Sequence, residues 1–266
     1  MTAVQKKRPA QRSGGGLWSA VKWTIAIGAA GALSGVFLLI FVFAYIYQQL
    51  PSIDVLTDYR PKVPLRVWSA EGRLIGEFGE ERRDFVRIAD VPKHVKDAIL
   101  CAEDDGFYEH HGIEVMGIAR AAIINVLTGR RGQGGSTITM QVARNFFLTT
   151  ERTYTRKLYE IAMSFKIENE LTKDQILEIY MNQIYLGQRA YGFEAAAKTY
   201  FGRPLAEISV GEAATIAGLP VAPSAYNPIV NPTRATMRRN YVLRRMYDLG
   251  RIDELTYQTE KSLPME

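Results

Sequence analysis

Cysteine and histidine are scarce in this chain of 266 residues, and their scarcity excludes several kinds of site. The single cysteine, Cys101, cannot form an intramolecular disulfide, so we expect it to be a small apolar core residue. The three histidines have no cysteine partners at the spacing of a zinc site. A phosphate-binding loop that ends in Gly-Lys-Ser or Gly-Lys-Thr is also missing. Acids, hydroxyls and cations are left as the groups that could carry chemistry.

A basic stripe is absent as well, although the net charge is +5. The first 22 residues contain five basic side chains and no acidic one, and the rest of the chain has 28 of each kind. The excess charge therefore belongs to the N-terminus, and no surface is left that could follow a nucleic-acid backbone. We expect no nucleic-acid partner.

Residues 23–47 form a long apolar run, 25 residues without a charge. A helix of this length crosses a hydrocarbon core of roughly 30 Å. The run is longer than the apolar region of a cleaved signal peptide, so we expect an uncleaved anchor. The basic cluster before it predicts a cytoplasmic N-terminus and an exported remainder. Gly31 and Gly35 are spaced as in a small-xxx-small packing face, which is compatible with a homodimer.

The rest of the chain contains a short β signal followed by a long helical part. Residues 65–69 and 73–78 alternate around an Ala-Glu-Gly turn and predict a β-hairpin. Downstream, Thr172 and Ser209 begin capping boxes, and Asn231 precedes a proline at a helix start. The expected parts are a disordered tail at 1–16, an anchor at 17–50, a linker at 51–64, a mainly α domain at 65–250 and an extension at 251–266.

Apolar side chains are also concentrated between the polar motifs. Residues 113–127 are apolar on nearly every face, and residues 146–148 add a second apolar patch. Burial in the core is the simpler explanation. Their position in an anchored protein favours a jaw at about 113–155 that dips into the outer leaflet of the membrane.

Glu103, which follows a helical run over residues 93–102, is the first candidate for chemistry. A carboxylate in a partly apolar cleft has a raised pKa and can act as a general acid or base. An isolated Glu-Asp pair is more often a solvated helix end, but Phe107, His110 and Gly112 follow at fixed offsets. We interpret His110 as a structural histidine that hydrogen-bonds a loop.

A glycine turn rich in hydroxyls follows at residues 134–141. It is either a donor of hydrogen bonds to phosphate or sugar oxygens or a helix start capped by serine or threonine. Further on, Lys157 and Glu160 are three residues apart and share a helix face. They form a surface pair or, facing a cleft, provide a cation for a diphosphate and an acid near the reacting centre. Arg144 and Asn145 would extend a cationic wall.

In order and spacing, these segments resemble the peptidoglycan glycosyltransferase (transglycosylase) domains of class A penicillin-binding proteins. The matching motifs are Glu-Asp-Asp-Gly-Phe-Tyr-Glu-His-His-Gly at 103–112, Gly-Ser-Thr-Ile-Thr-Met-Gln at 135–141, Arg-Lys-Leu-Tyr-Glu at 156–160, Glu-Ile-Tyr-Met-Asn at 178–182 and Arg-Arg-Asn-Tyr-Val-Leu-Arg-Arg-Met at 238–246. Met140 departs from the second motif, where glutamine is usual, and puts one polar contact in doubt.

The resemblance implies a lysozyme-like, two-lobed, mainly α fold. It also implies the polymerisation of lipid II into β-1,4-linked glycan strands with release of undecaprenyl pyrophosphate. Glu103 would be the general base, and Glu160 a second catalytic acid that positions the diphosphate with a divalent cation, Mg or Mn. The implied substrate and pyrophosphate binders are Lys157, Arg156, Arg144, Gln141, Asn145, Thr137, Ser136 and Asp104. The implied structural motif residues are Phe107, His110, Gly112, Glu178, Tyr180, Asn182 and Arg238.

The resemblance further implies a place in the bacterial inner membrane. The implied partners are lipid II, the growing lipid-linked glycan chain, the membrane and a cell-wall synthesis complex. Two other functions stay open, namely a lysozyme-like hydrolase or lytic transglycosylase that uses Glu103 as an acid, and a non-enzymatic scaffold. Because residues 219–228 resemble bifunctional members, we expect a fragment of a longer enzyme rather than a natural single-function one.

Overall fold

The computed structural model of the chain describes residues 15–57, 65–78, 81–117, 135–148 and 154–265. Most of the predicted tail at 1–16 and the middle of the predicted jaw at 113–155 lie outside these residues. The chain divides into two compact units, Met1–Gln49 and Leu50–Glu266.

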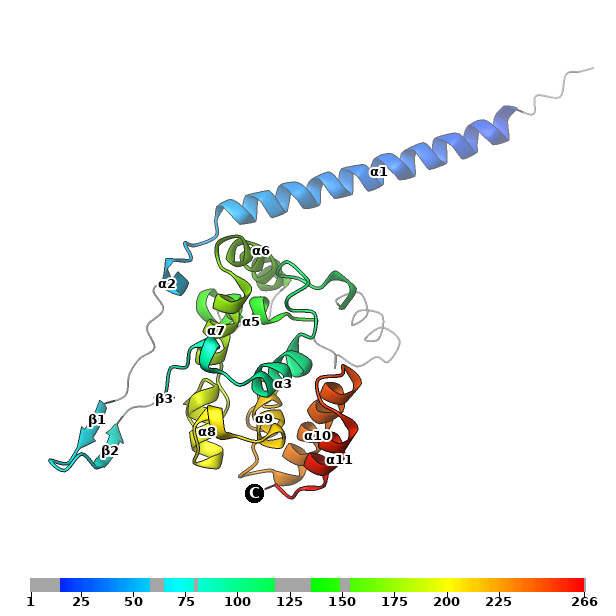
Figure 1. Cartoon of the computed structure of the whole chain (residues 1–266). Coiled ribbons are helices and arrows are strands. Elements are labelled where there is room, and N and C mark those ends of the chain that lie inside the picture. Colours follow the sequence, from blue (N-terminus) through cyan, green and yellow to red (C-terminus); the bar gives the residue numbers. More distant parts are fainter. Residues whose placement is uncertain (1–14, 58–64, 79–80, 118–134, 149–153, 266) are drawn as a thin grey trace, which may run out of the picture. The chain divides into compact units, whose positions relative to one another are not determined.

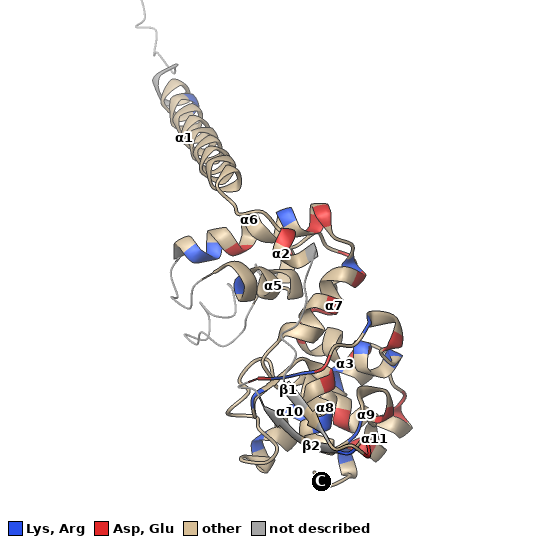
Figure 2. Cartoon of the chain, turned by 90° about the vertical axis from the view of Figure 1, so that its left-hand side faces the viewer, with Lys and Arg blue, Asp and Glu red and all other residues tan. Residues whose placement is uncertain are grey.

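The first unit is a single long helix, α1 (Gly15–Gln48). Its stretch Trp18–Gln48 is long and apolar enough to cross a membrane, since 31 residues at 1.5 Å each span about 46 Å. Large apolar side chains along it, such as Phe37 and Leu39, are exposed, and charged residues are almost absent from its length (Figure 2). Length and composition both agree with the predicted anchor.

The second unit begins at Leu50, the last residue of the predicted anchor, and includes the described part of the predicted linker. Leu50, Ile53 and Leu56 are buried around a short helix, α2 (Asp54–Thr57). Lys166, on the helix α6 (Tyr154–Glu170), donates to the carbonyl of Pro51, with 3.0 Å between Nζ and O. The chain is therefore fixed to the folded unit directly after the end of α1.

The predicted β-hairpin is present. Strand β1 (Leu65–Trp68) pairs antiparallel with β2 (Leu74–Phe78), and Gly72 in the turn has a φ of +79°, in the left-handed region that favours glycine. A second pair was not predicted: β3 (Arg82–Arg83) runs parallel to β4 (Ala190–Tyr191). Strands of two residues are too short to show a periodicity in the sequence.

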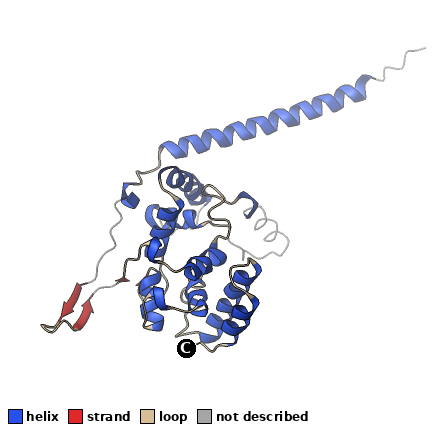
Figure 3. Ribbon diagram, viewed as in Figure 1, coloured by secondary structure: helices blue, strands red, loops and turns tan. Residues whose placement is uncertain are grey.

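The rest of the second unit is helical. Its other elements are η1 (Ile88–Asp90), α3 (Lys93–Glu103), α5 (Ile138–Phe147), α7 (Lys173–Gln183), α8 (Phe193–Phe201), η2 (Leu205–Glu207), α9 (Val210–Ala217), α10 (Pro232–Asp248) and α11 (Glu254–Ser262). One group contains α5, α6 and α7, and a second contains α3, α9, α10 and α11, with α8 touching both α7 and α9 (Figures 1 and 3). The predicted mainly α, two-lobed fold is confirmed.

Local sequence signals set most helix ends. Thr172 and Ser209 both form complete capping boxes, as predicted. The extension predicted at 251–266 differs, because it contains α11, which packs against α10. The rings of Tyr247 and Tyr257 stack there with centroids 5.3 Å apart, so this segment belongs to the folded unit.

Candidate active site

Glu103 is the last residue of α3, a helix held by its buried face. Val95, Ala98 and Ile99 on that face are fully buried, and α3 packs against both α9 and α10. The helix therefore fixes Glu103 in space. The side chain is half-buried, and its Oε2 accepts a hydrogen bond from Gln141 Nε2 on α5 at 2.8 Å. Its buried Oε1 has no hydrogen-bond partner among the described residues.

The surroundings of Glu103 favour its protonated form. Burial raises the pKa of this carboxyl above its ordinary value, and the charge of Asp104 adds to the rise. The hydrogen bond from Gln141 and the positive charges of Arg238 and Arg144 act in the opposite direction on the same pKa. A carboxylate with a raised pKa and a free oxygen can accept a proton from a substrate hydroxyl.

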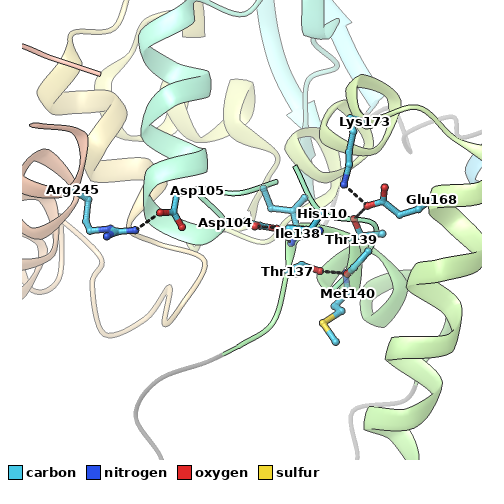
Figure 4. A network of polar contacts seen from close by, with 11 residues as sticks. Asp104, Asp105, His110, Thr137, Ile138, Thr139, Met140, Glu168, Lys173 and Arg245 are labelled. Atoms are coloured by element: carbon cyan, nitrogen blue, oxygen red, sulfur yellow. Dashed lines mark hydrogen bonds and ion pairs between the residues drawn. The ribbon is translucent and has the colours of Figure 1, made fainter. Parts of the chain in front are cut away.

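Asp104 connects the end of α3 to the start of α5. Its carboxylate lies 2.9 Å from His110 Nε2 and accepts the backbone N–H of Ile138, the first residue of α5, at 3.0 Å (Figure 4). The predicted structural role of His110 is in keeping with this contact. Asp104 itself is buried, and it sets the distance between the helices that carry Glu103 and Gln141.

The hydroxyl-rich turn is a capped helix start. Thr137 is the N-cap of α5 and accepts the N–H of Met140, while its own hydroxyl donates to the carbonyl of Gly112 at 2.6 Å. Gly112 has a φ of +80°, and a Cβ there would meet Ser164 at 3.1 Å. The capping alternative is thus correct, and it does not exclude a substrate contact, because Ser136 and Thr137 both line a cavity.

The predicted cations gather around Glu160 on α6. Lys157 Nζ lies 2.8 Å from Glu160 Oε2 and also donates to Ser136 Oγ at 2.8 Å. Arg156 Nε lies 3.4 Å from Glu160 Oε1. Glu160 is only 1 % exposed, so this is no solvated surface pair. Met140 is buried, with its sulfur 3.9 Å from the Lys157 ammonium, where the family has an amide in its second motif.

A cavity of about 420 Å³ brings many of the predicted residues together. Those on its wall are Glu103, Asp104, Ser136, Thr137, Gln141, Arg144 and Arg238. Lys157 reaches its edge through Ser136, while Arg156, Asn145 and Glu160 do not line it. Glu103 and the Lys157–Glu160 pair are therefore connected through the start of α5.

The remaining motif residues support the chain around the cavity. Glu178 accepts the N–H of Ile88 at 2.7 Å, and Asn182 bonds both the N–H and the carbonyl of Val86. These bonds fix the segment that enters α3. Phe107 is fully buried, and the ammonium of Lys173 lies 4.5 Å from its ring centroid. Lys173 also pairs with Glu168 (Figure 4).

Tyr180 is buried beside Glu103, and its hydroxyl has no partner among the described residues. Burial, with the Glu103 charge second, raises the pKa of this phenol well above its usual value, so it stays neutral. Cys101 is buried too, as predicted, and burial raises the pKa of its thiol to about 11. Neither group is therefore ionised at neutral pH.

Several residues that line the cavity were not predicted from the sequence. They include Asp105, Glu114, Pro220, Val221, Tyr241 and Arg245. Of these, Tyr241 and Arg245 follow Arg238 by three and seven residues, so they share one face of α10. That spacing was visible in the sequence, but the face could not be assigned to the site without the packing of α10 on α3.

Comparison with known proteins identifies the family of the chain. The chain matches the transglycosylase family over residues 71–247, and it belongs to that family. It is 53 % identical to penicillin-binding protein 1A of Neisseria flavescens over 221 residues, which are 83 % of this chain and 28 % of that protein. It is 49 % identical to penicillin-binding protein 1A of Pseudomonas aeruginosa over 248 residues, 93 % of this chain and 29 % of that protein.

A crystal structure at 2.6 Å of penicillin-binding protein 1A from Haemophilus influenzae is also similar. It shares 31 % identity at a TM-score of 0.46 and covers 78 % of this chain and 21 % of that one. The chain spans less than a third of the length of the curated relatives named above. The resemblance to the glycosyltransferase domains of class A penicillin-binding proteins is confirmed.

Proposed function

We propose that the chain is an inverting glycosyltransferase that joins lipid II units into β-1,4-linked glycan strands and releases undecaprenyl pyrophosphate. The observation that carries this proposal is the Glu103 carboxylate, which combines a raised pKa with a free, buried oxygen in a cavity that also holds Arg144. Membership of the transglycosylase family supports the same reaction.

In the proposed step, Glu103 accepts the proton of the 4-hydroxyl on the acceptor's GlcNAc. The oxygen attacks C1 of the donor's MurNAc, and the bond from C1 to the diphosphate oxygen breaks with its electron pair on the leaving group. A single displacement converts the α-linked donor into a β-linked product. Glu103 then returns its proton to solvent, which restores the base.

Cations on α5 and α6 would stabilise the departing diphosphate. Arg144 stands on the cavity wall, and Lys157 reaches its edge through Ser136. Fixed positive charge at the place where negative charge develops lowers the barrier. Glu160 holds Lys157 and Arg156 in position, so we assign it a positioning role, while its direct action on substrate stays a prediction.

The expected divalent cation has no resident site that these residues fit. Lys157 hydrogen-bonds Oε2 of Glu160, and among the described residues Oε1 has only the Arg156 guanidinium at 3.4 Å. No group of three or more acids, histidines or cysteines is placed to hold a metal ion in the described part of the chain. We therefore propose that Mg or Mn enters with the diphosphate of the substrate.

We further propose a single-pass protein of the inner membrane with its N-terminus in the cytoplasm. The length of α1 and the class A relatives support one membrane span, and the basic N-terminal cluster supports the orientation. Gly31 and Gly35 leave open space on α1, which is compatible with a homodimer. A cell-wall synthesis complex stays a prediction from the family.

The test is polymerisation of labelled lipid II in detergent with Mn²⁺, resolved by strand length. Wild type should form long glycan, and Glu103→Gln should lose at least about a thousandfold in rate, since its amide cannot accept the proton. Asp105→Asn, a matched loss of one carboxylate on the same cavity wall, should keep measurable polymerisation. Near-wild-type turnover by Glu103→Gln would rule out the base. Cleavage of preformed glycan would indicate the lytic reaction, and no turnover a scaffold.

A further inference from the structure

Three side chains of α10 stand on the same cavity wall as Glu103, namely Arg238, Tyr241 and Arg245. The two arginines differ in how their charge is balanced. Arg245 pairs with Asp105, with 3.0 Å between Nη2 and Oδ2. Arg238 has no carboxylate within ion-pair distance among the residues that the structure describes. A cation without a counter-ion in the cavity that contains Glu103 needs an explanation.

Arg238 is held in place by groups that carry no negative charge. Its Nε donates to the carbonyl of Gly218 at 3.3 Å, and its guanidinium lies 4.7 Å from the ring centroid of Tyr241 and 5.8 Å from that of Tyr226. The stem is also confined, because a Cβ on Gly218 would lie 2.7 Å from Arg238 Cγ. These contacts fix the position of the charge and leave it uncompensated.

We propose that Arg238 is a positioning residue of the reaction, whose uncompensated charge keeps Glu103 ionised and ready to accept the proton of the acceptor hydroxyl. This inference rests on the proposed function and adds to it a residue outside the expected donor-side set. A base has to be ionised before it can act, and burial of Glu103 works against ionisation. Arg238 offsets that effect from the same cavity.

The other charges near Glu103 do not replace Arg238. The titratable and charged groups around the carboxylate are Cys101, Asp104, Asp105, Glu114, Arg144, Tyr180, Tyr241 and Arg245, with His110 behind Asp104. Asp104 raises the pKa of Glu103, Arg238 is the strongest charge that lowers it, and Arg144 follows. When a donor diphosphate binds, it would neutralise Arg144 and add negative charge, which leaves Arg238 as the cation that still favours the ionised base.

The test compares pH profiles of kcat/KM for lipid II polymerisation in detergent. In Arg238→Gln the midpoint of the acid limb should shift to higher pH by about one unit. At a pH on that limb, kcat/KM should therefore fall about tenfold, while kcat/KM on the alkaline plateau changes little. Arg238→Lys should keep most of the wild-type profile. The double variant Asp105→Asn/Arg245→Gln removes an ion pair that is neutral overall from the same cavity, so its acid limb should stay in place whatever its overall rate. If Arg238 had a purely structural role, its substitution would lower kcat/KM by the same factor at every pH and leave the midpoint of the acid limb unchanged.

Gly218→Ala gives an independent variant that retains the arginine. Gly218 has a φ of −80°, which alanine adopts without strain, but the new methyl group displaces the Arg238 stem. Its acid limb should move in the same direction as that of Arg238→Gln. If both variants are folded by circular dichroism and polymerise with an unmoved limb, the inference is overturned. If Arg238→Gln does not fold, the result for Gly218→Ala decides: an acid limb at the same pH as in wild type overturns the inference.

A titration without turnover separates this inference from the proposed function. The carboxyl signal of Glu103 in ¹³C-glutamate-labelled protein can be assigned by its loss in Glu103→Gln. Its pKa should be higher in Arg238→Gln than in wild type, even if the wild type forms no glycan. Equal values would overturn the role of Arg238, while an inactive wild type would overturn only the proposed reaction.

Discussion

At Glu103, reactivity and stability make opposite demands on the carboxyl group, because the ionised form reacts and burial disfavours that form. Its pKa in the folded protein lies above the value in an unfolded chain because the folded protein buries it. Between those two pKa values the folded state binds more protons than the unfolded state, so the free energy of unfolding falls as pH rises. At neutral pH the ionised, reactive form is therefore the less stable one.

This opposition predicts that Glu103→Gln stabilises the protein while abolishing its activity. The neutral amide avoids the burial of a charge, and each unit of the raised pKa corresponds to about 1.4 kcal/mol in the free energy of unfolding. Thermal unfolding at pH 7.5 should give a higher Tm for the variant, and at pH 4 the difference should nearly vanish. A variant that is less stable than wild type at pH 7.5 would contradict the burial of an ionised carboxylate.

Single residues could be predicted where the signal for their role lies in a short stretch of sequence. Glu103 and the Lys157–Glu160 pair followed from motif and spacing, and the structure connects them through α5. The uncompensated charge of Arg238 could not be predicted, because it depends on which groups of α9 and α10 meet at the end of α3. The sequence alone indicated a motif arginine and did not show that it shares a cavity with Glu103.

At the level of elements, the site depends on how the end of α3 is joined to the start of α5. Asp104, the hydroxyl of Thr137 and the carbonyl of Gly112 make this junction through short polar contacts. The helix ends were predictable from caps and glycines, whose signals lie within a few residues. The junction was not, since it joins residues that are 25 and 34 positions apart.

Gly112→Ala should damage this junction. The φ of +80° costs an alanine about 1–2 kcal/mol, and its Cβ would press on the backbone and hydroxyl of Ser164, which adds about 1–3 kcal/mol. We expect a lower Tm and a loss of polymerisation as Thr137 shifts.

The matched control for this substitution is Gly202→Ala. Gly202 has a φ of +67°, but beyond its own chain neighbours no described atom lies within 4 Å of the position that a Cβ would take. It should lose only about 1–2 kcal/mol from backbone strain and keep its activity. Equal destabilisation by the two substitutions would show that the contact with Ser164 does not matter.

At the scale of the whole molecule, the chain combines a membrane-length helix with a folded unit that contains the cavity. A lipid-linked substrate is confined to a membrane, so an anchored enzyme meets it at a high local concentration. Composition and hydropathy predicted the long apolar helix, because a run of 25 residues without a charge has the length and character of a membrane span. The docking of Leu50, Ile53 and Leu56 after the helix was not predicted, since three apolar residues in a short segment carry no clear signal.

Deletion of residues 1–48 should therefore lower the rate of polymerisation much more in liposomes than in detergent. Because the anchor acts through local concentration, we expect the two losses to differ by about tenfold or more. Both media are tested with the same lipid II and Mn²⁺. A second variant that replaces Trp18–Gln48 with a leucine-rich helix of equal length should restore the rate in liposomes if α1 acts only as an anchor. Failure of that variant would assign a specific role to the sequence of α1, including Gly31 and Gly35. Equal losses in liposomes and detergent would contradict the anchoring role, because a free enzyme and a dissolved substrate gain nothing from a membrane span.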